Sequence, residues 1–85
     1  MPYRILITRQ AEKQLDAMPQ QLANRVDQHI EALREDPRPS GVKKLRGYTD
    51  TYRVRVGNRR IIYTIDDRAQ IITLLTIDDR KDVYR

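Results

Sequence analysis

The sequence predicts an α+β fold of order β-α-α-β-β-β, in which a two-helix hairpin packs on one face of a mainly antiparallel, twisted sheet. Two observations predict this fold. Apolar residues recur at helical spacing between Ala11 and Leu33, and from residue 51 onwards the spacing changes to the two-fold alternation of strands. The 85 residues contain no linker, repeat or low-complexity tract, so we expect a single domain over residues 1–85.

The first half of the chain predicts one strand and two helices. Residues 3–7 form an apolar run typical of a strand, and Thr8 can cap the helix that follows. Pro19 interrupts that helix and suits the first turn of a second one. Because prolines disfavour continued helix, residues 36–41 should form a loop. The expected apolar stripes consist of Ala11, Leu15 and Met18 in the first helix and of Leu22, Val26, Ile30 and Leu33 in the second.

The second half predicts strands joined by tight turns. The expected strands cover residues 42–45, 51–56, 60–65 and 71–77. Gly57-Asn58 supplies a hairpin turn, and Asp66-Asp67 offers the next one. The run at 71–77 is apolar on both faces, which indicates a strand inside the sheet.

The two helices carry the only long apolar stripes, so they should cover one face of the sheet and leave the other open. Alternation then places Tyr52, Val54 and Val56 on the helix side and Arg53 and Arg55 on the open side. We expect Arg60 to be exposed on the open side as well.

Two further residues are expected to be structural. Tyr63 takes the helix-facing register, as Tyr52 does, and both should belong to the core. His29, the single histidine, lies beside the apolar stripe of the second helix, and we expect it to lie away from the open face.

Positive charge is concentrated in one segment. Residues 38–60 carry eight basic side chains against one acidic residue, Asp50, while the whole chain has a net charge of +5. Such a segment suits a phosphate backbone, although a solvated basic face would look the same from charge alone. The absence of cysteine and the single histidine argue against a metal site, and the sequence suggests no cofactor. No apolar run reaches the roughly 20 residues of a membrane span, so we expect a cytoplasmic protein without a membrane partner.

Four short motifs occur in a fixed order along the chain. They are Lys44-Leu45-Arg46-Gly47, Tyr52-Arg53-Val54-Arg55, Arg59-Arg60-Ile61-Ile62-Tyr63 and Arg80-Lys81-Asp82-Val83-Tyr84-Arg85. In this order and spacing the whole chain resembles the RelE branch of the RelE/ParE toxin superfamily, which implies the RelE-like fold.

The resemblance implies a function and partners. It implies a toxin of a type II toxin–antitoxin system that cleaves messenger RNA in the ribosomal A site. The implied partners are the ribosome with its mRNA and a RelB-like antitoxin with an acidic or amphipathic segment. Operator DNA would be contacted only through the toxin–antitoxin complex.

The resemblance also implies site residues. The catalytic candidates are Arg53, Arg55, Arg60, Arg80 and Tyr84, and the RNA-binding candidates are Lys43, Lys44, Arg46, Arg59 and Lys81. Metal-free cleavage uses the 2′-hydroxyl as nucleophile, and guanidinium groups suit the charge that develops on phosphorus. A tyrosine can stack a base of the scissile dinucleotide.

The identity of the general base is open. The prototype of the RelE branch has lysines at the two positions that Arg53 and Arg55 occupy here, and one of those lysines could accept a proton. Arginine does not give up its proton near neutral pH. Many relatives have a histidine just before the arginine that matches Arg80, and here that position holds Asp79. Asp79 is therefore a possible base, with an exposed acidic turn at a strand end as the plainer interpretation.

Two other functions remain open. One is a ParE-like toxin that inhibits DNA gyrase and needs no cations on the open face. The other is a catalytically degenerate relative that only binds nucleic acid, which the missing lysines would fit. Arginines at both paired positions, together with Arg60, Arg80 and Tyr84, favour the ribonuclease over both.

Overall fold

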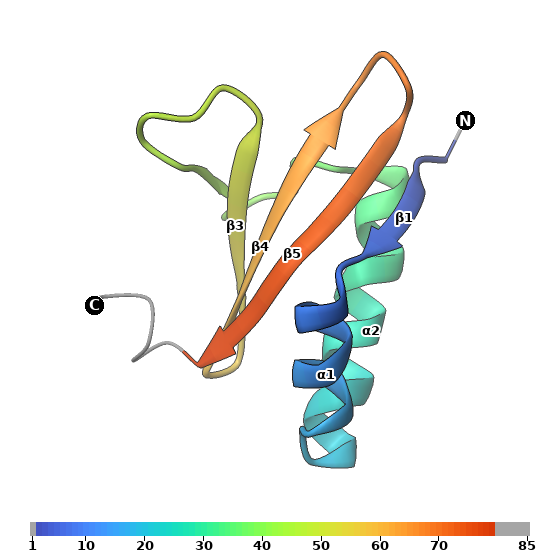
Figure 1. The fold of residues 1–85 in the computed structure, drawn as a ribbon, viewed down its shortest axis with the longest axis vertical. Helices are drawn as coiled ribbons and strands as arrows, with labels where there is room; N and C mark the ends of the chain where they lie inside the picture. The colour runs from blue at the N-terminus through green and yellow to red at the C-terminus, as the bar shows by residue number, and fades with distance from the viewer. Residues whose placement is uncertain (1, 80–85) are drawn as a thin grey trace.

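Two helices pack against one face of a five-stranded sheet in the computed structural model, which describes residues 2–79 (Figure 1). The elements are β1 (Arg4–Ile7), α1 (Arg9–Asp16), α2 (Gln20–Glu35), β2 (Lys43–Lys44), β3 (Thr51–Val56), β4 (Arg59–Asp66) and β5 (Ile71–Asp79). This order confirms the predicted fold class, including the short strand before β3. The last strand is longer than predicted, because Asp78 and Asp79 belong to β5 and do not form a turn.

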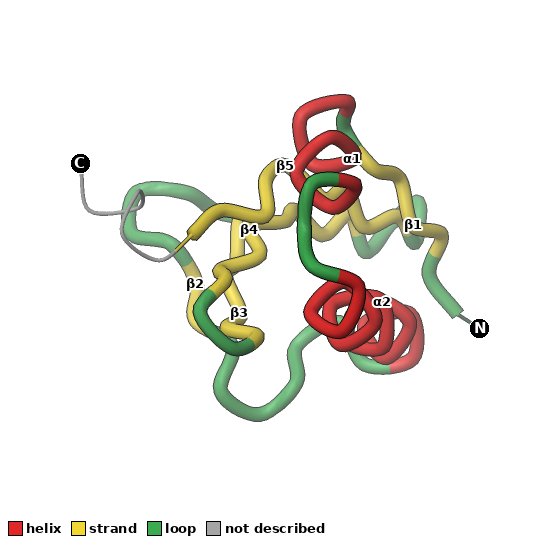
Figure 2. Tube along the Cα trace, turned by 90° about the horizontal axis from the view of Figure 1, so that it is seen from below, coloured by secondary structure: helices red, strands yellow, loops and turns green. Residues whose placement is uncertain are grey.

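The strands lie in the order β1-β5-β4-β3-β2, with β4 in the middle. β1 pairs with β5 in parallel, and the other neighbours are antiparallel. Figure 2 shows β1 and β2 at opposite sides of the sheet. Gly57, with φ of 61°, opens the tight turn between β3 and β4, where a side chain would be strained.

The core lies between the helices and the sheet, as the apolar stripes predict. Thr8 caps α1 by accepting a hydrogen bond from the Ala11 amide at 3.2 Å. The buried apolar side chains are Ala11, Met18, Val26, Ile30, Leu33, Val54, Val56, Ile61, Tyr63, Ile65, Ile72, Leu74 and Ile77. Tyr63 is fully buried and donates to the Pro37 carbonyl at 2.8 Å, and burial raises its pKa. Tyr52 is half-buried and stacks on Tyr63.

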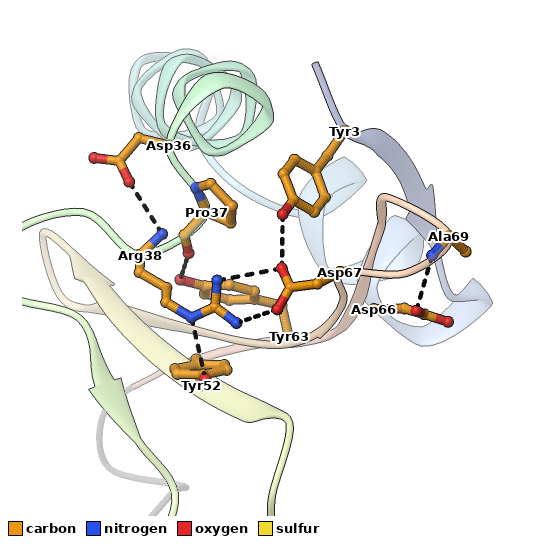
Figure 3. Close-up of polar contacts among 9 residues, drawn as sticks. All are labelled: Tyr3, Asp36, Pro37, Arg38, Tyr52, Tyr63, Asp66, Asp67 and Ala69. Carbon is orange, nitrogen blue, oxygen red and sulfur yellow. Dashed lines mark hydrogen bonds and ion pairs between the residues drawn. The ribbon is translucent and has the colours of Figure 1, made fainter. Parts of the chain in front are cut away.

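A polar cluster anchors the loop between α2 and β2 (Figure 3). Arg38, in that loop, binds both carboxylate oxygens of Asp67 in the turn between β4 and β5. Its guanidinium also lies over the Tyr52 ring, 5.2 Å from the ring centre. The Tyr3 hydroxyl donates to the same Asp67 carboxylate at 2.6 Å. The loop that leads to β2 is thereby joined to β3 and to the turn between β4 and β5.

Candidate functional site

The arginines of β3 and β4 occupy the sheet face opposite the helices, which we call the open face. The register pairs Val54 with Ile61, and both are buried under the helices. The next pair, Arg55 and Arg60, therefore belongs to the open face, because neighbouring residues of a strand point to opposite sides. On β5 the register continues this row with Asp78. One row across three strands thus contains two arginines and a carboxylate.

Arg53 and Arg55 lie where alternation predicts. Arg55 is exposed and Arg53 is half-buried, while Val54 between them is buried. Arg53 pairs with Ile62 on one side and with Lys43 on the other. Cationic side chains from β2 and β3 are therefore next to each other.

The expectation that Arg60 is exposed is wrong, since its side chain is fully buried. The register does assign Arg60 to the open face, but β4 is the middle strand of the sheet. A side chain there has neighbours on both sides, so sharing a face with Arg55 does not imply sharing its exposure. The Arg60 side chain therefore contributes to the packing of the open face and is not exposed to solvent.

His29 was expected to lie away from the basic face, and the structure corrects this. His29 is exposed on α2 and lines an open pocket of about 440 Å³ together with Lys43, Arg53 and Arg55. Pro39, Ser40, Gly41 and Val54 complete the wall. We call this the basic pocket. The loop held by Arg38 forms one side of it, so only the tertiary structure brings His29 to the arginines.

A second hollow, which shares Lys43 and Arg53 with the basic pocket, contains an aromatic residue that sequence reasoning missed. It is lined by Lys43, Lys44, Leu45, Arg46, Tyr48 and Arg53, and we call it the tyrosine pocket. Tyr48 is 61% exposed, a high value for a large aromatic side chain. The signal was present in the sequence, because an aromatic residue that follows several cations is typical of single-stranded nucleic-acid sites.

The remaining predicted residues are not all brought together. Lys43, Lys44 and Arg46 are exposed beside Arg53, as an RNA-binding role requires. Arg59 pairs with Val56 and Asp79, one position out of step with Arg55 and Arg60. Lys81 and the catalytic candidates Arg80 and Tyr84 lie outside the described residues. They stay predictions.

Residues 2–79 contain neither a candidate metal cluster nor a candidate membrane helix. No group of three or more histidine, cysteine, aspartate or glutamate side chains in this part of the chain could hold a metal ion. No helix in it is long and apolar enough to cross a membrane.

The fold and the cationic open face define a small α+β protein suited to a polyanion. The family model described as "ParE toxin of type II toxin-antitoxin system, parDE" matches residues 5–84. Toxin RelG of Mycobacterium tuberculosis is 33% identical over 86 residues, covering 100% of this chain and 99% of its own. The putative toxin RelE1 of Methanocaldococcus jannaschii is 31% identical over 90 residues, covering 100% and 98%.

A solved structure agrees with these relatives. The RelE chain of the archaeal RelE-RelB complex from Pyrococcus horikoshii superimposes with a TM-score of 0.85 at 32% identity, covering 94% of this chain and 97% of that one. The chain therefore belongs to the RelE/ParE superfamily and is a RelE-type toxin of the type II toxin–antitoxin class.

Proposed function

We propose that this toxin is a ribosome-dependent endoribonuclease that cleaves messenger RNA in the A site and so inhibits translation. The observation that carries the proposal is the pairing of Arg53 and Arg55 on the open face, flanked by Lys43 and the two cation-lined pockets. A scissile phosphate bound between these side chains would have its developing negative charge stabilised by guanidinium donors. Ribosome-bound mRNA also implies action in the cytoplasm.

The cleavage needs no metal in this proposal. The 2′-hydroxyl attacks the adjacent phosphate, and arginines take the part that a divalent cation plays in other nucleases. The remaining cations, Lys43, Lys44 and Arg46, bind the flanking backbone in a salt-dependent way. No cofactor enters the reaction.

A test begins with purified ribosomes stalled with a defined codon in the A site. After incubation with the toxin, primer extension should reveal a new mRNA end in the A-site codon. The same mRNA without ribosomes should stay intact. A sulfur atom in place of a non-bridging oxygen at the cleavage site should slow the reaction, and Cd²⁺ should not rescue it. Rescue by Cd²⁺ would refute the metal-free mechanism.

Gyrase inhibition is the second candidate function, because the description of the matching family model names ParE toxins. A supercoiling assay with purified gyrase separates the two. Inhibited supercoiling with intact A-site mRNA would favour the ParE-like activity. The absence of both effects would favour the degenerate relative.

The proposed partner is a RelB-like antitoxin, since the Pyrococcus relative was solved as a RelE-RelB complex. An acidic or amphipathic antitoxin segment would mask the cationic open face, and charge complementarity would make association fast and salt-sensitive. Operator DNA would be bound only by the toxin–antitoxin complex. Expression of the toxin without its antitoxin should arrest growth.

A further inference from the structure

Asp78, near the end of β5, is held by the side chain of Gln14 from α1. Gln14 Nε2 donates a hydrogen bond to Asp78 Oδ1 at 2.5 Å. Gln14 Oε1 in turn accepts from the Ile77 amide at 2.6 Å and from the Thr76 hydroxyl at 3.0 Å. The two hydrogen bonds to Oε1 fix the Gln14 amide against β5, and the amide then orients the Asp78 carboxylate through Nε2.

Gln14 reaches the carboxylate around the edge of β5. β1 pairs with β5 only as far as Leu74, and α1 lies alongside the part of β5 beyond that point (Figure 1). Ile77 is buried under the helices, so its neighbour Asp78 belongs to the open face. The Gln14 side chain thus contacts three successive residues of β5, Thr76, Ile77 and Asp78.

This carboxylate belongs to the same row as two arginines. Asp78 pairs with Arg60, and Arg60 pairs with Arg55 on the next strand. Two strand spacings separate Asp78 from Arg55 by about 10 Å at the backbone. The buried side chain of Arg60 stands between the two in this row, whereas Asp78 is only partly buried, so its carboxylate can be reached from solvent at this end of the row.

Metal-free cleavage requires a group that accepts the 2′-hydroxyl proton, and none of the open-face arginines can do so. We propose that Asp78 is the general base of the cleavage reaction and that Gln14 is its positioning residue. This inference rests on the proposed ribonuclease function. It replaces Asp79, which pairs with Arg59 and is out of step with the row of Arg55 and Arg60.

Proton transfer and bond formation occur together in this step. The Asp78 carboxylate takes the proton of the 2′-hydroxyl while the 2′-oxygen forms a bond to phosphorus. The bond from phosphorus to the 5′-oxygen breaks, and that oxygen takes a proton from solvent or from a protein acid. The products are a 2′,3′-cyclic phosphate and a 5′-hydroxyl, and Asp78 then returns its proton to solvent.

The surroundings of Asp78 allow its protonation to be read from activity. In the described part of the chain the groups that face it are Arg60 and, beyond it, Arg55 from the sheet, and from α1 the neutral amide of Gln14. The cleavage rate should therefore fall towards acidic pH with a limb that depends on one carboxylate.

The first experiment compares Asp78→Asn with the wild-type toxin in single-turnover cleavage at saturating ribosome from pH 4.5 to 9. Asparagine keeps the acceptor for Gln14 Nε2 but cannot take a proton, so the rate should fall by about 100-fold or more, with the acidic limb lost and ribosome binding unchanged. Asp16→Asn, on the exposed end of α1, is the matched control and should behave as wild type. A loss of less than tenfold overturns the assignment of Asp78.

The second experiment uses Gln14→Glu, which keeps the shape and the acceptor for the Ile77 amide. A second carboxylate beside Asp78 favours protonation of the pair, so the acidic limb should move to higher pH. Gln14→Met should lower the rate about tenfold without moving ribosome affinity. A Gln14→Glu variant with an unshifted pH profile shows that Gln14 only joins α1 to β5, and it overturns the positioning role.

The ribonuclease function and the assignment of Asp78 as its base can be refuted separately. If the wild-type toxin leaves A-site mRNA intact, the ribonuclease function itself is wrong. If the wild-type toxin cleaves and Asp78→Asn cleaves equally fast, the function stands and Asp78 is not the base. A loss confined to Asp79→Asn likewise rules out Asp78 as the base.

Discussion

Arg38 donates two hydrogen bonds to the Asp67 carboxylate, from Nη1 at 3.3 Å and from Nη2 at 2.8 Å. The pair joins the loop after α2 to the turn between β4 and β5, 29 residues further along the chain. The loop it fixes contributes Pro39, Ser40 and Gly41 to the basic pocket. A contact outside the open face thus determines the shape of one wall of the site.

The Asp67 pair should make stability depend on acidic pH. The hydrogen bonds from Arg38, and then that from Tyr3, hold the pKa of Asp67 below its ordinary value. Between the two values the unfolded chain binds more protons, so the stabilisation is complete above about pH 4 and is lost as pH falls below it. Chemical denaturation of Asp67→Asn should show a lower midpoint at pH 7 and a smaller drop towards pH 3. Glu31→Gln, which breaks an exposed ion pair with Arg34 on α2, is the control and should change little.

Arg53 and Arg55 should matter for activity and little for folding. Removing one donor to the developing charge should cost about 100-fold in single-turnover cleavage, because the lost contact forms only in the transition state. Both side chains are at least partly exposed, so the free energy of unfolding should stay within about 0.5 kcal/mol in Arg53→Ala and Arg55→Ala. Arg68→Ala, in the turn between β4 and β5, is the charge-matched control. If a folded variant with both Arg53→Ala and Arg55→Ala cleaved as fast as the wild-type toxin, these two arginines would not bind the scissile phosphate.

Arg60 should behave differently from its two neighbours. Truncation of a fully buried side chain on the middle strand removes its packing, so Arg60→Ala should lower the free energy of unfolding by about 1–3 kcal/mol. Arg60→Met keeps most of the volume and should recover part of that loss. Urea denaturation measures both variants, and a fully stable Arg60→Ala would contradict the structural role.

The comparison of Arg55 with Arg60 shows what the sequence can and cannot predict. The face of a strand residue follows from two-fold alternation, which is local and needs no coordinates. Exposure depends on everything that packs around a side chain, which is set by contacts far apart in the chain. The same reason accounts for His29, whose contact with the basic pocket depends on how the loop at residues 36–41 folds back.

Asp78 illustrates a further limit. The apolar pattern ends at Ile77, so it predicts a strand end there, but backbone pairing with β4 extends the strand by two more residues. That extension decides which aspartate faces Arg60. The helical stripes, the capping of α1 by Thr8 and the turn at Gly57 were all predictable, because each depends on residues close together in sequence.

Tyr48 should contribute to RNA binding through its ring. An exposed aromatic side chain among Lys43, Lys44 and Arg46 can stack a base next to the clamped phosphate, and stacking contributes about 1–3 kcal/mol per base. Tyr48→Ala should raise the half-saturating toxin concentration on ribosomes about tenfold or more, whereas Tyr48→Phe should bind as wild type. Equal losses in both variants would assign the effect to the hydroxyl and would exclude stacking.

The last prediction concerns Arg53→Lys, which restores the residue type of the prototype. If Asp78 is the base, a lysine at this position has no proton to accept, and it loses the two-pronged contact that a guanidinium makes with phosphate. The single-turnover rate should then fall by about threefold to tenfold, with the pH profile unchanged. If the lysine itself acts as a base, the rate should rise and the profile should shift, because neighbouring cations lower the pKa of a lysine towards neutrality. Measuring Arg53→Lys in the background of Asp78→Asn separates the two cases, since only a lysine base restores cleavage there. Restored activity in that double variant would return the proton transfer to β3 and would overturn the assignment of Asp78 as the base.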